Sequence, residues 1–289
     1  MKKSYLYVLT ILLGSILLSG CRQELRGNLG MEDLSQPTES NSVVTMQGNL
    51  KGGLLRIAVD ADFENRKGVW IDLDGDGKRS TEGVEDVKVF GSYADYRVTS
   101  GIRKINLHGD ITSLQGASNG LTEIVVSGNP NLRVLNLPSN QLRSIDLSSN
   151  PQLERLDVSG NQLSEINLSA NSRLVSLWCF NNQLEKIDLS PCPNLVVLDC
   201  SGNGLTTLDV KAQTKLSSLM AYNNRLSSID VSQNLVVHKL WLYGNRLSET
   251  EIHRVIRDLK KSINGDLWLS VEPLPNDLRM VALEKGWKL

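Results

Sequence analysis

The sequence predicts a mostly β solenoid, in which short repeats stack on one another and share one continuous core. Between Leu132 and Leu247 the leucines recur every 21 residues, and each repeat divides into two similar half-repeats of 10 and 11 residues. Each half-repeat contains an L-x-L segment, whose alternation suits a strand with one buried face. No single repeat can bury its own leucines, so neighbouring repeats must stack.

An amide side chain closes almost every half-repeat. The turn positions are Asn140, Asn150, Asn161, Asn171, Asn182, Cys192, Asn203, Gln213, Asn224, Asn234 and Asn245. An amide can pair with backbone groups of the bend and of the adjacent coil, and we expect Cys and Gln to be tolerated in the second half-repeat. The period and the consensus L-x-x-L-x-L-x-x-N-x-L predict a leucine-rich repeat solenoid over residues 101–247, with about seven coils including an irregular first one. Between Asn234 and Leu240 the frame slips by one residue, and we expect a bulge or a turn adjustment there.

The nested repeats, such as LDVSGNQL and LWCFNNQL, resemble those of Bacteroidetes surface lipoproteins, some of which are called internalin-like. This resemblance implies a repeat face that recognises partners, with capping units at both ends. The segment GVWIDLDGDGKRSTEGVEDV is similar to a β-domain segment of those proteins, and the final LEKGWKL is similar to their C-terminal caps.

The first residues have the composition of a targeting segment. Residues 1–20 contain Lys2 and Lys3 and then a short apolar run, and Leu18-Ser19-Gly20-Cys21 resembles a bacterial lipobox. We therefore predict a lipoprotein signal peptide over residues 1–20 and lipidation of Cys21. The alternatives are an ordinary secretory signal or an N-terminal membrane anchor. Residues 21–45, which have few bulky apolar side chains, are predicted to form a flexible tether.

Residues 46–100 contain strand-like patches between Gly- and Asp-rich turns, which predicts a small β-domain that caps the solenoid. Within it, Asp72, Asp74 and Asp76 match the first half of a calcium loop. The acid expected at the twelfth position is absent, since Gly83 lies there between Glu82 and Glu85. The alternative is a polar turn, for which Asp-Gly is strongly favoured.

Residues 248–289 change to a helical period and predict a C-terminal α/β cap. Ser248 and Glu251 have the spacing of a capping box. An apolar helix face follows them, then a strand at residues 267–269 and a second helix from about Asp277 to Lys285. Because this cap should cover the leucines of the last coil, we expect truncation before it to cause aggregation.

Composition and motifs argue against catalysis and against nucleic-acid binding. The net charge is −1 without a basic cluster, and the three histidines are scattered along the chain. The sequence contains no HExxH, GxSxG, Walker or dinucleotide motif. We therefore expect a protein that is not an enzyme and needs no cofactor, unless calcium binds. Cys179 and Cys200, one repeat apart, are predicted to be buried free thiols.

The outward positions of the strands are the best candidates for a binding face. Aromatic side chains and methionine gather there in the C-terminal half, at Trp178, Phe180, Met220, Tyr222, Trp241 and Tyr243. Rings on a rigid sheet can anchor a protein partner or stack on sugar rings, so the alternatives are protein recognition and glycan binding. A third alternative is a ladder that only stabilises the sheet. The other half-repeat presents aspartates, such as Asp146 and Asp188, that we expect to bond to nearby serines or backbone amides.

Taken with the predicted anchor, this face suggests an outer-membrane lipoprotein that faces the cell surface or the periplasm. Its partner would be a protein, such as one on a host or neighbouring cell, and its contact with the membrane would be through the lipid only.

Overall fold

A computed structural model describes residues 42–50, 53–269 and 274–289. The chain divides into two units, Met1–Thr38 and Glu39–Leu289, and all described residues belong to the second. The predicted signal peptide, Cys21 and all but the last few residues of the predicted tether lie outside the described residues. Within the described part of the chain, no helix has the length and apolar composition needed to cross a membrane.

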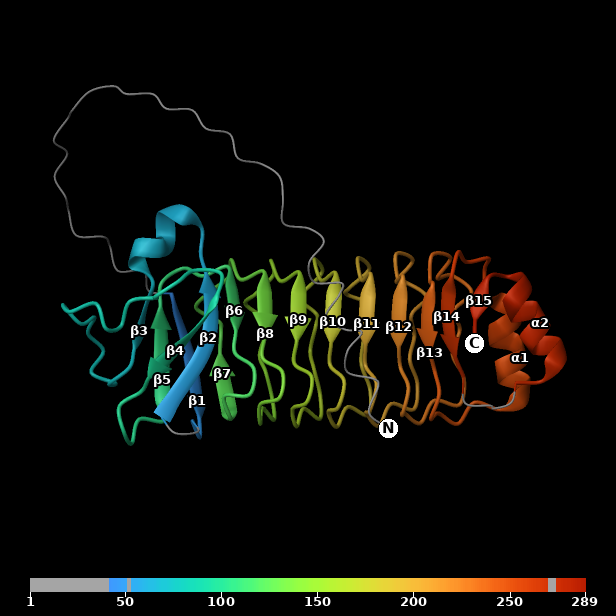
Figure 1. Ribbon diagram of the computed structural model, residues 1–289, viewed down its shortest axis with the longest axis horizontal. Helices are drawn as coiled ribbons and strands as arrows, with labels where there is room; N and C mark the ends of the chain where they lie inside the picture. The colour runs from blue at the N-terminus through green and yellow to red at the C-terminus, as the bar shows by residue number, and fades with distance from the viewer. Residues whose placement is uncertain (1–41, 51–52, 270–273) are drawn as a thin grey trace, which may run out of the picture. The chain divides into compact units, whose positions relative to one another are not determined.

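An eleven-stranded sheet runs through the second unit in the order β15-β14-β13-β12-β11-β10-β9-β8-β6-β2-β4 (Figure 1). One short strand per coil forms its middle: β6 (Ser113–Gln115), β8 (Val134–Asn136), β9 (Arg155–Asp157), β10 (Ser176–Trp178), β11 (Val197–Asp199), β12 (Ser218–Met220) and β13 (Lys239–Trp241). These strands are parallel, and Leu156 pairs with Leu177 in the next coil. The predicted stacking of leucines in successive layers is confirmed.

The N-terminal strands continue both sides of the solenoid. The antiparallel strands β2 (Leu54–Asp60) and β4 (Tyr93–Arg97) extend the long sheet beyond β6. A second sheet has the order β3-β5-β1-β7, with β1 (Val43–Gly48), β3 (Trp70–Asp72), β5 (Lys104–His108) and β7 (Leu121–Val125). The 3-10 helix η3 (Phe63–Gly68) lies between β2 and β3. Strands from both sides of residue 100 therefore share both sheets.

The first half-repeat alone forms strands in the regular coils. The expectation of a strand in each half-repeat is wrong, since within the described residues 126–238 the second half-repeats are turns and irregular extended segments. Asp146 Oδ1 accepts a hydrogen bond from the amide of Ser148 at 2.9 Å, and Asp188 does the same for Ser190. Each is a local turn in which a side chain bonds to the backbone two residues on. The bonding expected for these aspartates is confirmed, and it lowers the pKa of both.

The expected bulge or turn adjustment between Asn234 and Leu240 is also wrong, because the frame does not slip there. Val237 is buried at the position that leucine holds in the preceding coils, and Leu240 pairs with Leu219 in the same register as elsewhere. The repeat is therefore unbroken, and it was not recognised in the sequence because valine replaces leucine at this position. The two residues before Val237, Leu235 and Val236, are exposed at turn positions that are mostly polar in the other coils.

The C-terminal cap covers the last coil with two helices and two strands. These are α1 (Glu249–Asp258), β14 (Gly265–Trp268), α2 (Asn276–Glu284) and β15 (Trp287–Lys288). Ser248 Oγ accepts a hydrogen bond from the Glu251 amide, as predicted for an N-cap. The Glu251 carboxylate instead accepts from the amide of Ile229 in the preceding coil, at 2.9 Å, and so ties the helix to the solenoid. Ile252, Val255 and Ile256 are buried beneath it.

Buried asparagines link each coil to the one before. In the first half-repeat, Asn161 Oδ1 accepts from the Leu142 amide at 3.0 Å, while its Nδ2 donates to three carbonyl oxygens. In the second half-repeat, Asn171 Nδ2 donates to two carbonyls, and its Oδ1 has no partner among the described residues. Only a donor is needed there, which explains why Gln213 can replace asparagine.

Candidate functional site

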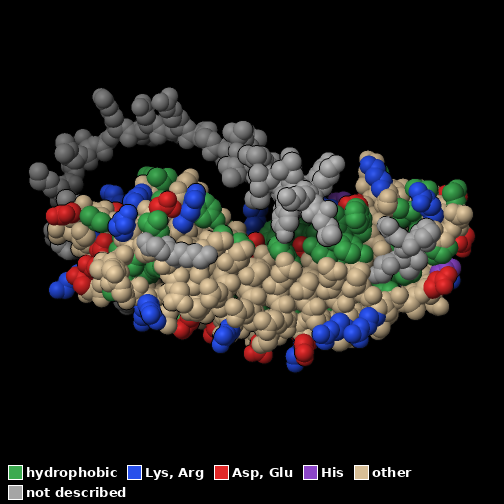
Figure 2. All heavy atoms as spheres, turned by 60° about the horizontal axis from the view of Figure 1, so that its bottom comes forward, with side chains coloured by type: hydrophobic (Ala, Val, Ile, Leu, Met, Phe, Trp, Pro, Cys, Tyr) green, Lys and Arg blue, Asp and Glu red, His purple; other side chains and the backbone are tan. Residues whose placement is uncertain are grey.

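One row of outward side chains crosses the long sheet. The strand registers place Trp178, Asp199, Met220, Trp241 and Trp268 side by side on β10 to β14. A second row, two residues further along each strand, holds Phe180, Ser201, Tyr222 and Tyr243. Figure 2 shows hydrophobic side chains gathered over this half of the molecule, where Figure 1 places β10 to β14. We call the two rows together the aromatic face.

The six residues predicted from the sequence are half-buried on this face. The structure divides them into two groups, since Asp199 and Ser201 on and after β11 separate Trp178 and Phe180 from the other four. The two tyrosines, Tyr222 and Tyr243, are stacked with their ring centroids 4.6 Å apart and their planes 9° from parallel.

The face extends into the C-terminal cap, which sequence reasoning missed. Trp268 on β14 is 53% exposed, and its ring lies 5.9 Å from Trp241 and 6.0 Å from Tyr243. One carboxylate holds both indoles: Asp266 Oδ2 accepts from Trp241 Nε1 at 3.0 Å, and Oδ1 accepts from Trp268 Nε1 at 2.8 Å. The Leu-Trp-Leu strand pattern was the available signal, but the inserted α1 breaks the 21-residue spacing that would have aligned Trp268 with Trp241.

Two aspartates, Asp157 and Asp199, lie on the same face and differ in exposure. Asp199 is only 7% exposed, and burial raises the pKa of its carboxyl to about 6. Asp157 lies on β9, two strands from β11 in the direction away from Tyr222 and Tyr243. It is half-buried, and burial also raises the pKa of its carboxyl. Each accepts two hydrogen bonds from the serine two residues on, which favour the charged form and oppose this rise.

The predicted calcium ligands gather only in part. Ligand oxygens of Asp72, Asp74 and Glu85 all lie within 4.8 Å of one another, whereas Asp76 is outside this group. Glu85, one of the two acids nearest to the vacant twelfth position, therefore approaches the aspartates in the folded loop. Hard oxygen ligands of this kind suit calcium. Calcium binding stays a prediction.

Backbone amides already donate hydrogen bonds to most of the carboxylate oxygens of this cluster. The two carboxylate oxygens of buried Glu85 accept from the amides of Leu73, at 3.0 Å, and Ser80, at 2.7 Å. Asp72 Oδ1 accepts from the amide of Gly75 at 2.7 Å. These bonds hold the loop in a polar turn, which is compatible with both alternatives.

The three described cysteines are buried free thiols, as predicted for Cys179 and Cys200. Cys179 and Cys200 occupy the same inward position in adjacent coils, behind the aromatic face. Burial raises the pKa of both thiols well above the ordinary range, so neither is a reactive thiolate.

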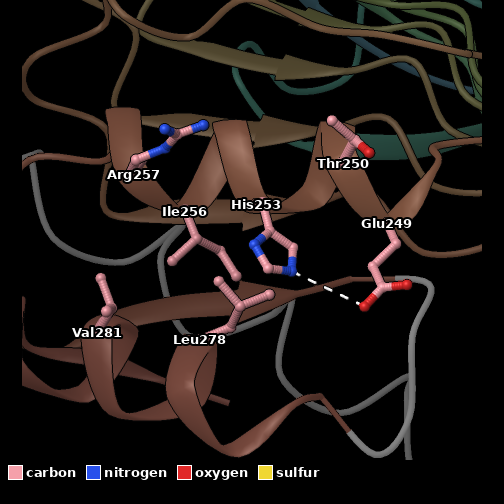
Figure 3. A pocket seen from close by; sticks show the side chains of 7 residues that line it. All are labelled: Glu249, Thr250, His253, Ile256, Arg257, Leu278 and Val281. Atoms are coloured by element: carbon pink, nitrogen blue, oxygen red, sulfur yellow. Dashed lines mark ion pairs between the residues drawn. The ribbon is translucent and has the colours of Figure 1, made fainter.

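A groove of about 460 Å³ lies between the two cap helices (Figure 3). Ile256, Leu278 and Val281 form its apolar side, and the His253 imidazole points along it toward Glu249, with 3.9 Å between Nε2 and Oε1. A histidine beside an exposed carboxylate four residues away is an ordinary surface pair on one helix. None of the side chains predicted to bind a ligand lines this groove.

Comparisons with known proteins agree with the repeat architecture. A family model of leucine-rich repeats in two copies matches residues 130–170 and 172–213. No curated protein matches the chain. The functional domain of InlJ from Listeria monocytogenes, which includes a cysteine ladder, is 32% identical with a TM-score of 0.52; the match covers 58% of this chain and 37% of that one.

Two further solved structures show weaker likeness. An internalin, InlF, from Listeria monocytogenes is 23% identical over 58% of this chain and 50% of its own, with a TM-score of 0.49. A leucine-rich repeat protein from Leptospira interrogans is 22% identical over 46% and 43%, with a TM-score of 0.40. The chain thus spans half or less of each of these structures. Its fold is a leucine-rich repeat solenoid, made mostly of short strands in one long sheet, and it is similar to the InlJ domain.

Proposed function

We propose that this protein is a non-enzymatic recognition protein that binds a protein partner through the aromatic face. The observation that carries this proposal is the group of four rings, Tyr222, Trp241, Tyr243 and Trp268, that contact one another on the sheet surface. Stacked repeats present extended, rigid binding surfaces, and large aromatic side chains are the commonest binding hot spots.

The Asp266 clamp favours binding over a purely structural ladder. Rings that only stabilise the sheet need contact with one another, which the stacked tyrosines already provide. The carboxylate of Asp266 additionally fixes the orientation of two indoles, one of which is more than half exposed. A ring that is fixed before binding loses little conformational entropy when a partner covers it.

The protein-binding proposal is tested with Trp241→Ala and Trp268→Ala. For a partner selected from a protein display library against the wild-type chain, we expect each substitution to weaken binding by about thirtyfold or more, the effect of a hot spot worth about 2 kcal/mol. Phe63→Ala is the matched control, because Phe63 is 84% exposed but lies on η3, away from the aromatic face. Binding that tolerates both tryptophan substitutions would exclude this face as the site.

Glycan binding is the alternative function, because half-exposed rings on a rigid sheet can also stack on sugar rings. A glycan array probed with the wild-type chain distinguishes the two proposals. A glycan hit that is lost in Trp178→Ala and Trp241→Ala, together with no protein partner, would favour the alternative.

We further propose that the chain is an outer-membrane lipoprotein anchored through Cys21, exposed at the cell surface or facing the periplasm, with a role in adhesion to host or neighbouring cells. The lipobox-like segment before Cys21 supports this proposal. In cells fed an alkyne-tagged fatty acid, we expect the full chain to be labelled and Cys21→Ala to lose all label. Cys192→Ala, which changes a buried thiol, should keep the label. An unlabelled wild-type chain would contradict the lipid anchor.

A further inference from the structure

Asp199 lies at the centre of the aromatic face, between two pairs of larger side chains, and we call the position above its carboxylate the slot. Asp199 and Ser201 lie on and after β11, with Trp178 and Phe180 on one neighbouring coil and Met220 and Tyr222 on the other. The two walls are two strand spacings apart, or roughly 10 Å at the backbone.

The floor carboxylate is only partly satisfied. Ser201 donates from its amide and from its hydroxyl to the same oxygen of Asp199, Oδ1, at 3.1 and 2.5 Å. Among the described residues, Oδ2 has no such hydrogen bond and Asp199 makes no ion pair with a lysine, arginine or histidine. Oδ2 is not one of the fully buried polar atoms without a partner, so it reaches the surface, where a cation of a partner can pair with it.

The other charged side chains near the slot do not neutralise the Asp199 carboxylate. The Lys239 ammonium lies 4.9 Å from the centre of the Trp241 ring, two strands from β11, and lowers the pKa of Asp199 only as a minor influence beside burial. Asp157, which lies two strands away on the other side, acts in the opposite direction. The net field at the floor of the slot therefore favours a positive charge.

We propose that the slot receives a basic side chain, lysine or arginine, of the protein partner, with its cation at Asp199 Oδ2 and its aliphatic stem between the two walls. This inference rests on the proposed function, since it names the partner chemistry for the same face. Aromatic walls attract cations through their ring faces, and long basic side chains bury their stems along apolar surface. With Oδ1 already taken by Ser201, the carboxylate offers a single oxygen, which both an ammonium and a guanidinium can use.

Asp157 is an internal comparison for this proposal. It accepts the same pair of hydrogen bonds from Ser159, at 3.0 and 2.6 Å. Only one of its flanks is aromatic, since Asn136 and Pro138 lie on the other side. The same Asp-x-Ser segment therefore lacks a second wall at Asp157. We expect the basic side chain to bind at Asp199 and not at Asp157.

The test uses a display library of random 12-residue peptides, selected against the full chain. We expect binders to be enriched in lysine or arginine, and Asp199→Asn to weaken their binding by about tenfold to a hundredfold, the range for a desolvated charge that loses its partner. Asparagine keeps an acceptor for Ser201, so the slot should keep its shape. Asp209→Asn, at an exposed turn of the other half-repeat, should change binding by less than twofold.

Single substitutions in a selected peptide identify the basic group. Replacement of its enriched lysine or arginine by norleucine should reproduce the loss seen with Asp199→Asn, and exchange of lysine for arginine shows which head group is preferred. If binders lose affinity with Trp241→Ala but not with Asp199→Asn, the cation proposal fails and the binding face stands. If binders are insensitive to both substitutions, the proposed function itself fails.

Discussion

A chain that ends at Leu247 is expected to be insoluble, because it lacks the whole C-terminal cap. Removal of α1, α2, β14 and β15 leaves β13 as an open edge strand and uncovers Leu240, Leu242 and Leu247. Each leucine loses about 1.5–3 kcal/mol of burial, and the sum approaches the net stability of a small domain. An unpaired edge is also a template for aggregation. Centrifugation after expression, followed by size-exclusion chromatography with light scattering, measures the outcome.

Met280→Ala in the full chain is the control for this truncation, since Met280 is 56% exposed on α2 and should be dispensable for solubility. A soluble chain ending at Leu247 with a single cooperative urea transition would show that the last coil does not need a cover.

The substitution Asn161→Ala is expected to lower the free energy of unfolding by about 3 kcal/mol. The Leu142 amide loses its acceptor, and within the described residues no other group accepts from this amide. The carbonyls of Leu137, Val158 and Ser159 each lose one donor, although each keeps another. A buried amide without a partner is the costliest of these losses.

Asn171→Ala is the matched comparison, with an expected loss of about 1–2 kcal/mol. Asn171 only donates, and the carbonyls of Leu147 and Asn150 that it serves also accept from backbone amides. Urea unfolding at equal slope gives both differences. Equal losses at Asn161 and Asn171 would show that the acceptor oxygen contributes nothing.

The leucine spacing was enough to predict the solenoid and the register of its strands. Each coil is a local unit, and its leucines can be buried only against the same leucines of the next coil, so Leu156 had to pair with Leu177. The ends lacked this information. Strands β2 and β4 join the long sheet by antiparallel pairing between segments without a shared period, and Glu85 reaches Asp72 through a turn whose path no repeat specifies.

The candidate site was predictable where it depends on alternation alone. Side chains two apart on a strand share a face, which placed Trp178 and Phe180 together and Trp241 beside Tyr243. The burial of Asp199 was not predictable, because it depends on how closely large side chains of the flanking coils approach it. The outward column contains Asp157 and Asp199 as equal members, and only the neighbouring coils make them different.

The constant interval between coils has a consequence for how such a surface can evolve. A tandem duplication or loss of one complete coil inserts or deletes a strand without disturbing either end of the sheet, since every coil offers the same two edges to its neighbours. The distance between two side chains on the face would then change in steps of one strand width, about 4.8 Å. Selectivity for partners of different size can thus be altered in discrete increments by recombination, before any point mutation refines it.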